Sequence, residues 1–203
     1  MCNFKSAIVV RDESAKGGFR LLLSPWTESH YELCHIFKLN DTAAARLYFA
    51  RVEFSPPDLS TADKLDTYKF KIDEERTPEW FDSEIKEKVT ERLSDYIKSI
   101  IVTGDVSLLI GGQFIVAGKA KIEAVKACVI TAMLESANVG TMWGSANVGT
   151  MWGSAKVGMM RESANVGEMW GSANVGEMWG SANVGTMWES AKVEKDERTP
   201  AAK

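Results

Sequence analysis

The chain has 203 residues, of which 45% are hydrophobic and 26% charged, so it is long enough to bury a sizeable core. Its formal net charge of −4 argues against a protein that binds nucleic acid through charge, because such proteins carry a basic excess. Cys2, Cys34 and Cys128 lack the spacing of a zinc site and favour a reducing compartment. No apolar run resembles a signal peptide or a membrane span, so we expect a cytoplasmic protein without a membrane partner.

The first part of the chain predicts a small α+β domain. Four strands are predicted, at residues 4–10, 19–23, 47–54 and 67–72. Thr27 is expected to cap a helix that continues to about Lys38, because Thr is a good N-cap residue and apolar residues follow it.

A long helix is predicted to follow these strands. Thr77 and Pro78 indicate its start, since Thr is favoured at the N-cap and Pro at the first helical position. Apolar residues then recur four apart from Phe81 to Ile101, which gives the helix one broad apolar face. We expect the helix to end near Thr103 and the first domain to span residues 1–104.

After residue 104 the sequence pattern changes to short segments in which apolar and polar residues alternate. Residues 127–135 align with the repeat that follows, with Ile130, Met133 and Leu134 at its Val, Met and Trp positions. The predicted boundaries are degenerate coils at 105–135, clean copies at 136–193, together a solenoid at 105–193, and a charged tail at 194–203. The charges of the tail are expected to discourage end-to-end stacking.

The clean copies are a nonapeptide with the consensus Ser-Ala-Asn-Val-Gly-Thr-Met-Trp-Gly. Seven copies begin at Ser136, Ser145, Ser154, Ser163, Ser172, Ser181 and Ser190. A unit of nine residues cannot bury its own apolar face, so the copies must stack on one another. Recurrent glycine excludes one continuous helix, and the spacing excludes five- and six-residue coils.

The remaining solution is a β-solenoid with two nonapeptides, or 18 residues, in each coil. Its period is similar to that of the calcium-binding nonapeptide rolls of secreted toxins. Those rolls place Asp in the turn, and this repeat has none there. We therefore expect no calcium, no other metal and no cofactor.

The tolerance of each repeat position predicts which way its side chain points. Position six holds Glu168 and Glu177 in two copies, so it should face water, because an unpaired carboxylate is rarely buried. Alternation along a strand then places the Met column, from Met142 to Met187, inside and the Trp column outside. The Val column is also expected inside, with the glycine at position five turning the chain between Val and Met.

An 18-residue coil arranges the position-eight side chains in two ladders. Trp143, Arg161 and Trp179 form one ladder, and Trp152, Trp170 and Trp188 form the other. Columns of exposed tryptophan predict self-packing, self-association or a ligand platform. The candidate binding residues are Trp143, Trp152, Trp170, Trp179, Trp188, Glu168 and Glu177, the carboxylates being suited to sugar hydroxyls.

No constellation of residues predicts catalysis. His30 and Cys34 lie four apart on one helix, but no third ligand or partner follows at a telling spacing. The acidic run Asp73, Glu74 and Glu75 is typical of a solvated helix entrance. Neither glycine pair has the context of a phosphate-binding loop. We therefore expect no catalytic residue, no metal site and no enzymatic activity.

Three short segments carry a resemblance. Residues 51–57 (Arg-Val-Glu-Phe-Ser-Pro-Pro), 69–73 (Lys-Phe-Lys-Ile-Asp) and 77–82 (Thr-Pro-Glu-Trp-Phe-Asp), ahead of a helix and short repeats, resemble uncharacterised proteins of bacteriophages and bacterial mobile elements. The resemblance covers the first half of the chain. It implies an accessory protein acting in the host-cell cytoplasm, and it transfers no site residue.

The sequence thus predicts a non-enzymatic interaction protein that binds protein and associates with itself through a solenoid face. A homodimer joined by one Trp face is the expected assembly, and a host protein is the other partner considered. The alternative is a ligand binder whose Trp rings stack on carbohydrate or nucleobase rings. An ice-binding or DNA-mimic surface ranks last, because Met159 and two Glu interrupt the Thr column.

Overall fold

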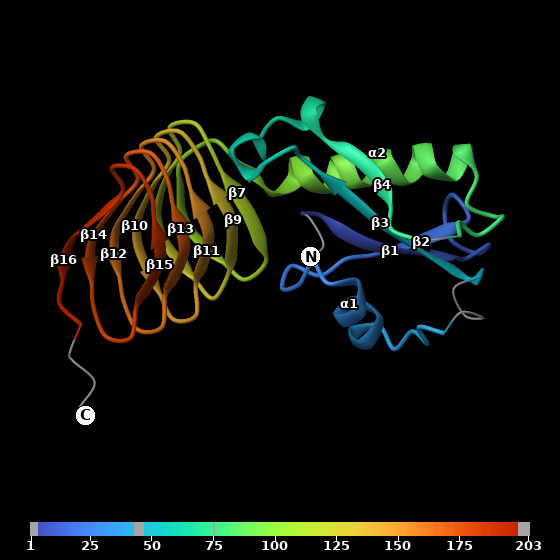
Figure 1. The fold of residues 1–203 in the computed structure, drawn as a ribbon, viewed down its shortest axis with the longest axis horizontal. Coiled ribbons are helices and arrows are strands. Elements are labelled where there is room, and N and C mark those ends of the chain that lie inside the picture. The colour runs from blue at the N-terminus through green and yellow to red at the C-terminus, as the bar shows by residue number, and fades with distance from the viewer. Residues whose placement is uncertain (1–3, 43–46, 75, 199–203) are drawn as a thin grey trace. The chain divides into compact units, whose positions relative to one another are not determined.

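A computed structural model of the protein describes residues 4–42, 47–74 and 76–198 (Figure 1). The chain divides into two compact units, Met1–Ser99 and Ile100–Lys203. The predicted fold class is confirmed: a small α+β unit is followed by a parallel β-solenoid with 18 residues per coil. The expectations for Cys2 and Glu75 lie outside the described residues.

The first unit contains a four-stranded antiparallel sheet in the order β2-β1-β3-β4. Its strands are β1 (Ser6–Arg11), β2 (Phe19–Leu22), β3 (Phe49–Ser55) and β4 (Lys69–Ile72). Its helices are α1 (His30–Ile36), α2 (Ser83–Ile100) and two short 3-10 turns, η2 (Leu59–Thr61) and η3 (Leu65–Thr67). The apolar face of α2 is buried as predicted, with Val89, Leu93 and Ile97 fully enclosed.

Both helices begin later than the sequence predicted. Ser29 rather than Thr27 caps α1, since its side chain accepts a hydrogen bond from the Glu32 amide. The predicted start of α2 at Thr77 is wrong, because the Pro78 carbonyl accepts from the Phe81 amide in a separate turn. The Asp82 carboxylate then accepts from the Ile85 amide at 2.9 Å and caps the helix.

The second unit is a solenoid of two parallel sheets with six strands each (Figure 1). We call one the even sheet and the other the odd sheet, after the strand numbers. The even sheet contains β6 (Val106–Ile110), β8 (Lys121–Lys126), β10 (Asn138–Trp143), β12 (Lys156–Met160), β14 (Asn174–Met178) and β16 (Lys192–Asp196). The odd sheet contains β5 (Ile101–Val102), β7 (Gln113–Val116), β9 (Val129–Met133), β11 (Asn147–Met151), β13 (Asn165–Met169) and β15 (Asn183–Met187).

The solenoid extends beyond both predicted boundaries. Strand β5 ends at Val102, before the predicted start at residue 105, and pairs with β7. Strand β16 continues to Asp196, so the first residues of the predicted charged tail form a strand. The alignment of the degenerate coil is confirmed, because Ile130 pairs with Val148 and Met133 with Met151.

The core of the solenoid consists of the Ala, Val and Met columns, as predicted. Met142, Met151, Met160, Met169 and Met178 are all buried. Met187 is 47% exposed, which contradicts its predicted place inside. The reason is its position in β15, which pairs with β13 and lies at the end of the odd sheet.

The glycine at position five does not turn the chain, contrary to the prediction. It lies within the strands, and the ladder pairs Val139 with Val157 and Thr141 with Met159 while passing over this glycine. Val and Met can therefore both point inward although they are three residues apart. A Cβ atom on Gly158 would lie 2.6 Å from the Gly140 carbonyl oxygen, so the close approach of stacked backbones requires glycine here.

The turn is made at position nine. Gly144, Gly153, Gly171 and Gly180 have φ between +67° and +71°, the left-handed region that glycine adopts without strain. Glu162 and Glu189 occupy the same position with φ of +57° and +60°. The turn therefore tolerates a side chain, whereas position five does not.

Candidate functional site

The odd sheet carries a column of three stacked tryptophan rings on its outer face. The ring centroids of Trp152 and Trp170 are 5.1 Å apart with an interplanar angle of 7°, and those of Trp170 and Trp188 are 5.1 Å apart at 17°. This spacing follows from the strand separation of a parallel sheet, since the residues are 18 apart. Both faces of Trp170 are covered by its neighbours in the column, and Trp188 at the end of the column is stacked on one face.

Two glutamates at position six accept a hydrogen bond from the indole two residues further along the chain. The Trp170 Nε1–H donates to Glu168 Oε2 at 3.1 Å, and the Trp179 Nε1–H donates to Glu177 Oε2 at 3.0 Å. Glu168 and Glu177 are the carboxylates that were predicted to bind sugar hydroxyl groups. Their engagement with the indoles means that they orient the Trp rings.

Trp152 differs because Thr150 stands at position six of its strand. The Thr150 hydroxyl lies 3.4 Å from the Thr131 carbonyl oxygen, to which it donates, and the side chain is buried. This corrects the expectation that the whole column faces water, since a small hydroxyl can be covered where a carboxylate cannot. The Trp152 Nε1–H is buried and has no hydrogen-bond partner among the described residues.

The second predicted ladder lies on the even sheet and does not stack. Trp143 and Trp179 are each 39% exposed, and Arg161 stands between them along the column. Lys126 Nζ lies 5.3 Å from the Trp143 ring centroid, and Lys195 Nζ lies 5.9 Å from that of Trp179. Cations therefore approach these rings, as in cation–π pairs.

The two sheets differ most in charge. The strands of the odd sheet contain one charged residue, Glu168. The strands of the even sheet contain nine: Lys121, Glu123, Lys126, Lys156, Glu177, Lys192, Glu194, Lys195 and Asp196. Consecutive nonapeptides fall on opposite sheets, so substitutions in alternate copies collect on one side of the solenoid.

Amide side chains run beside the tryptophan column of the odd sheet. Asn165 Nδ2 donates to Asn147 Oδ1 at 2.8 Å, and Asn183 Nδ2 donates to Asn165 Oδ1 at 3.0 Å. We define the odd face as the outward positions three, six and eight of β11, β13 and β15, with the Trp residue following each strand. Its members are Asn147, Thr150, Trp152, Asn165, Glu168, Trp170, Asn183, Thr186 and Trp188. The face is polar without being charged, apart from Glu168.

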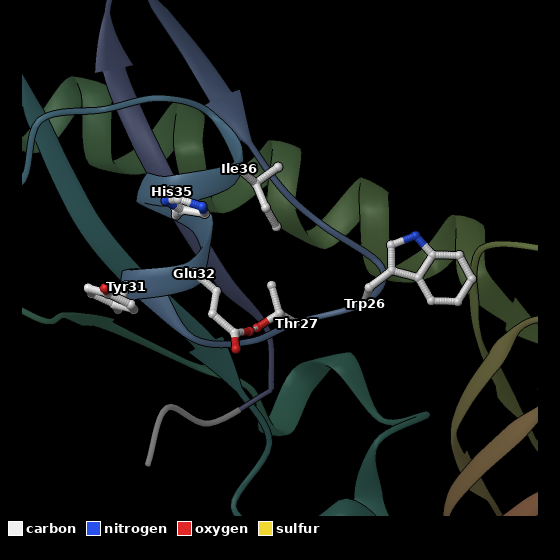
Figure 2. A pocket seen from close by; sticks show the side chains of 6 residues that line it. All are labelled: Trp26, Thr27, Tyr31, Glu32, His35 and Ile36. Carbon is white, nitrogen blue, oxygen red and sulfur yellow. Dashed lines mark hydrogen bonds between the residues drawn. The ribbon is translucent and has the colours of Figure 1, made fainter.

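The first unit has a surface hollow of about 380 Å³ beside α1. Trp26, Thr27, Tyr31, Glu32, His35 and Ile36 line it. Figure 2 shows Trp26 at one end and Tyr31 at the other, with Thr27 and Glu32 between them. The Thr27 hydroxyl donates to the Glu32 carboxylate, the contact drawn as a dashed line. Trp26 and Tyr31 are 61% and 75% exposed, so they form open walls around a carboxylate that already has a partner.

Three side chains of the first unit that can act as metal ligands, His30, Glu53 and Asp73, lie close together. Their ligand atoms are within 4.8 Å of one another. His30 Nδ1 lies 3.0 Å from Asp73 Oδ2, and His30 Nε2 lies 3.1 Å from the Val52 carbonyl oxygen. The carboxylate and the carbonyl are both acceptors, so each ring nitrogen has an acceptor beside it. Cys34, the other residue of the predicted pair, is buried in the core of the first unit.

A lysine neutralises the carboxylates of this cluster. Lys71 Nζ lies 3.4 Å from Glu53 Oε2 and 3.5 Å from Asp73 Oδ1. Burial raises the pKa of Asp73, but His30 and Lys71 lower it by more, so the pKa is below its usual range. The cluster is thus a paired charge network. Sequence reasoning missed Glu53, because only the pairing of β3 with β4 brings it beside Lys71.

Lys5 is the most deeply buried charged side chain of the first unit. Its Nζ donates to the Ser24 carbonyl oxygen at 2.5 Å and to Glu28 Oε1 at 2.9 Å. Burial lowers the pKa of Lys5, and Glu28 opposes that shift. The ammonium is enclosed by these partners, which gives it a structural role.

Comparison with protein-family models finds no match, and comparisons with curated proteins and with solved structures find none either. Among the described residues, no helix combines the length and the apolar character needed to cross a membrane. Any functional assignment therefore rests on the geometry of the chain itself.

Proposed function

We propose that the protein is a non-enzymatic binding protein that associates with another protein molecule, first a second copy of itself, through the odd face of the solenoid. The charge segregation between the sheets carries this proposal. One charged residue on the odd strands, against nine on the even strands, leaves one flat face that can be desolvated at little electrostatic cost.

A second copy fits this face for two reasons. Two odd faces meet with little like-charge repulsion, because Glu168 is the one charged member of each, whereas two even faces would bring many charges together. The columns also repeat at the strand spacing, so two copies related by a two-fold axis make the same contacts at each coil. The stacked rings of Trp152 and Trp170, which are half-buried, and of Trp188, which is exposed, supply the aromatic contact area typical of such interfaces.

A second candidate function is the binding of carbohydrate or nucleobase rings on the even sheet. It is supported by Trp143 and Trp179, which are exposed, unstacked and two coils apart, about 10 Å along the column. Arg161 between them could contact a hydroxyl or a phosphate. The stacked column of the odd sheet supports this function only at Trp188.

The accessory role in a bacteriophage or mobile element, a host-protein partner and a cytoplasmic location stay proposals as well. They rest on the resemblance of segments in the first unit and on the composition of the chain.

The test is a pair of identical substitutions on opposite faces. Asn165→Lys places a charge at the centre of the odd face, and Asn138→Lys places the same charge on the even sheet. Lys already occupies this repeat position at Lys156 and Lys192, both on the even sheet. On the odd sheet, Asn165→Lys also removes the hydrogen bonds of Asn165 with Asn147 and Asn183. We expect Asn165→Lys to weaken the homodimer at least about tenfold in sedimentation velocity, and Asn138→Lys to leave it unchanged. A monomeric wild type at tens of micromolar, or equal effects of the two variants, would overturn self-association through this face.

A further inference from the structure

The last coil of the solenoid presents two end strands with different chemistry. Strand β15 pairs with β13, and β16 pairs with β14; each is the terminal strand of its sheet. End strands expose backbone groups that can pair with a further strand. Whether they do so depends on the side chains that flank the edge.

The β16 edge is blocked by charge. Asp196 pairs with Met178 and so takes the place of the inward Met column. Arg198 Nε donates to Asp196 Oδ1 at 2.7 Å, and the second guanidinium nitrogen donates to Oδ2 at 2.5 Å. Four of the five β16 residues are charged. An inward-pointing carboxylate and flanking charges are features that stop strand addition in natural sheets.

In the described part of the chain, no strand pairs with the outer edge of β15. Its five residues, Asn-Val-Gly-Thr-Met, include no charge, and Met187 and Trp188 are each 47% exposed. Trp188 stacks on Trp170 with one ring face and leaves the other free. In the coil before, the Ala164 carbonyl oxygen accepts from the Asn183 amide at 2.9 Å. The corresponding oxygen of Ala182 accepts from the Arg198 guanidinium at 3.3 Å, a longer contact that an arriving amide can replace.

We propose that the β15 edge binds one extended, uncharged peptide segment of a partner protein, added as a parallel strand. The chain itself shows the chemistry that fits, because β13 receives β15 in the same way. Val166 receives Val184, Met169 receives Met187, and Trp170 receives Trp188 at 5.1 Å. The partner segment therefore has two apolar side chains three residues apart, a small residue after the first, and an aromatic ring directly after the second.

The blocked β16 edge selects a single segment over a whole stacked coil. A second solenoid placed on this end would set one of its strands against β15 and the other against β16. Its inward apolar column would then meet the Asp196 carboxylate, whose pKa the hydrogen bonds from Arg198 hold at about 2. One open edge beside one blocked edge admits strand addition without end-to-end stacking.

The experiment measures binding of a fluorescein-labelled peptide, Lys-Ser-Ala-Asn-Val-Gly-Thr-Met-Trp-Gly-Lys, to the full chain by fluorescence anisotropy. The matched control peptide has Asp in place of both Val and Met. We expect saturable binding of the first peptide at one site per chain and at least about tenfold weaker binding of the control. No saturation up to about 1 mM, or equal binding of the two peptides to the wild-type chain, would overturn the proposal.

Two variants locate the site. Met187→Asp copies the carboxylate of Asp196 onto the open edge, and we expect it to weaken peptide binding at least about tenfold. Asp196→Met combined with Arg198→Ser opens the other edge, and we expect two peptides per chain. Circular dichroism confirms that each variant keeps its strands. Wild-type affinity in Met187→Asp, or one site in the double variant, would contradict the assignment. Because this site lies on the strand edge, Asn165→Lys on the odd face should leave peptide binding unchanged.

Discussion

The repeat contains two glycine columns with different physical roles. At position five, glycine allows the backbones of stacked coils to approach, since a Cβ on Gly158 would lie 2.6 Å from the Gly140 carbonyl oxygen. At position nine, glycine supplies a positive φ, and a Cβ on Gly144 would meet nothing closer than 3.9 Å. One column is constrained by space and the other by backbone conformation.

This difference predicts the outcome of two alanine substitutions. Gly158→Ala should lower the free energy of unfolding by at least about 3 kcal/mol, because the stacked strands must move apart. Gly144→Ala should lower it by about 1–2 kcal/mol, the cost of a left-handed residue with a side chain. Urea unfolding followed by tryptophan fluorescence measures both values. A larger cost for Gly144→Ala would show that the assignment of the two columns is reversed.

Cys128 is expected to make the solenoid less stable at alkaline pH. The side chain is fully buried at the Ala position of a degenerate coil, and burial raises its pKa from 9.0 to about 11. The folded state therefore keeps the proton that the unfolded state loses above pH 9. This contribution to the stability is fully present below pH 9 and is lost as the pH rises towards 11, by roughly 3 kcal/mol at most.

The matched variant is Cys128→Ala, because Ala occupies this column in every clean copy. Unfolding free energies of the two proteins at pH 8 and pH 11 are compared. We expect the wild type to lose more stability than the variant over this interval. Equal losses would mean that the thiol does not contribute to the pH dependence.

At the scale of elements, the start of α2 depends on one side chain. Pro78 and Thr77 carry the expected start signal, yet the chain makes a turn there and the Asp82 carboxylate accepts from the Ile85 amide at 2.9 Å. Asp82→Ala should lower the free energy of unfolding of the first unit by about 1 kcal/mol, the usual value of an N-cap. Thr77→Ala should change it by less than about 0.5 kcal/mol. Thermal unfolding of both variants measures these changes. A larger effect of Thr77→Ala would show that α2 begins at Thr77 and not at Ser83.

At the scale of the whole solenoid, the proposed self-association depends on which copies share a sheet. The copies that begin at Ser145, Ser163 and Ser181 supply β11, β13 and β15, and the copies between them supply the even strands. Lys156, Arg161 and Lys192 all fall in the even set. The basic substitutions of the clean copies therefore all lie on the even side of the solenoid. The variants Asn165→Lys and Asn138→Lys test whether the sheet that carries the charge matters, since the two variants have the same amino-acid composition.

The sequence alone was sufficient for the architecture of the solenoid. A nine-residue period with inward Val and Met and outward Trp is compatible with few folds. Every further copy has the same pattern and therefore favours the same fold. The 18-residue coil, the buried columns and the separation of the Trp residues into two ladders were predictable for this reason. The strands of the first unit were also predictable, because their apolar patterning is local.

Tertiary structure decided what depends on contacts between coils and at their end. Ring stacking is a contact between coils, and it joins Trp152, Trp170 and Trp188. The hydrogen bonds from the indoles to Glu168 and Glu177 depend on the side-chain conformations within each coil. The role of the position-five glycine appears only when a second backbone lies against it. Met187 follows the same pattern as five buried Met residues and is exposed because no strand of the described chain covers it. A periodic sequence specifies each coil equally well, but burial depends on neighbouring coils, and among the described residues the last coil is paired on one side only.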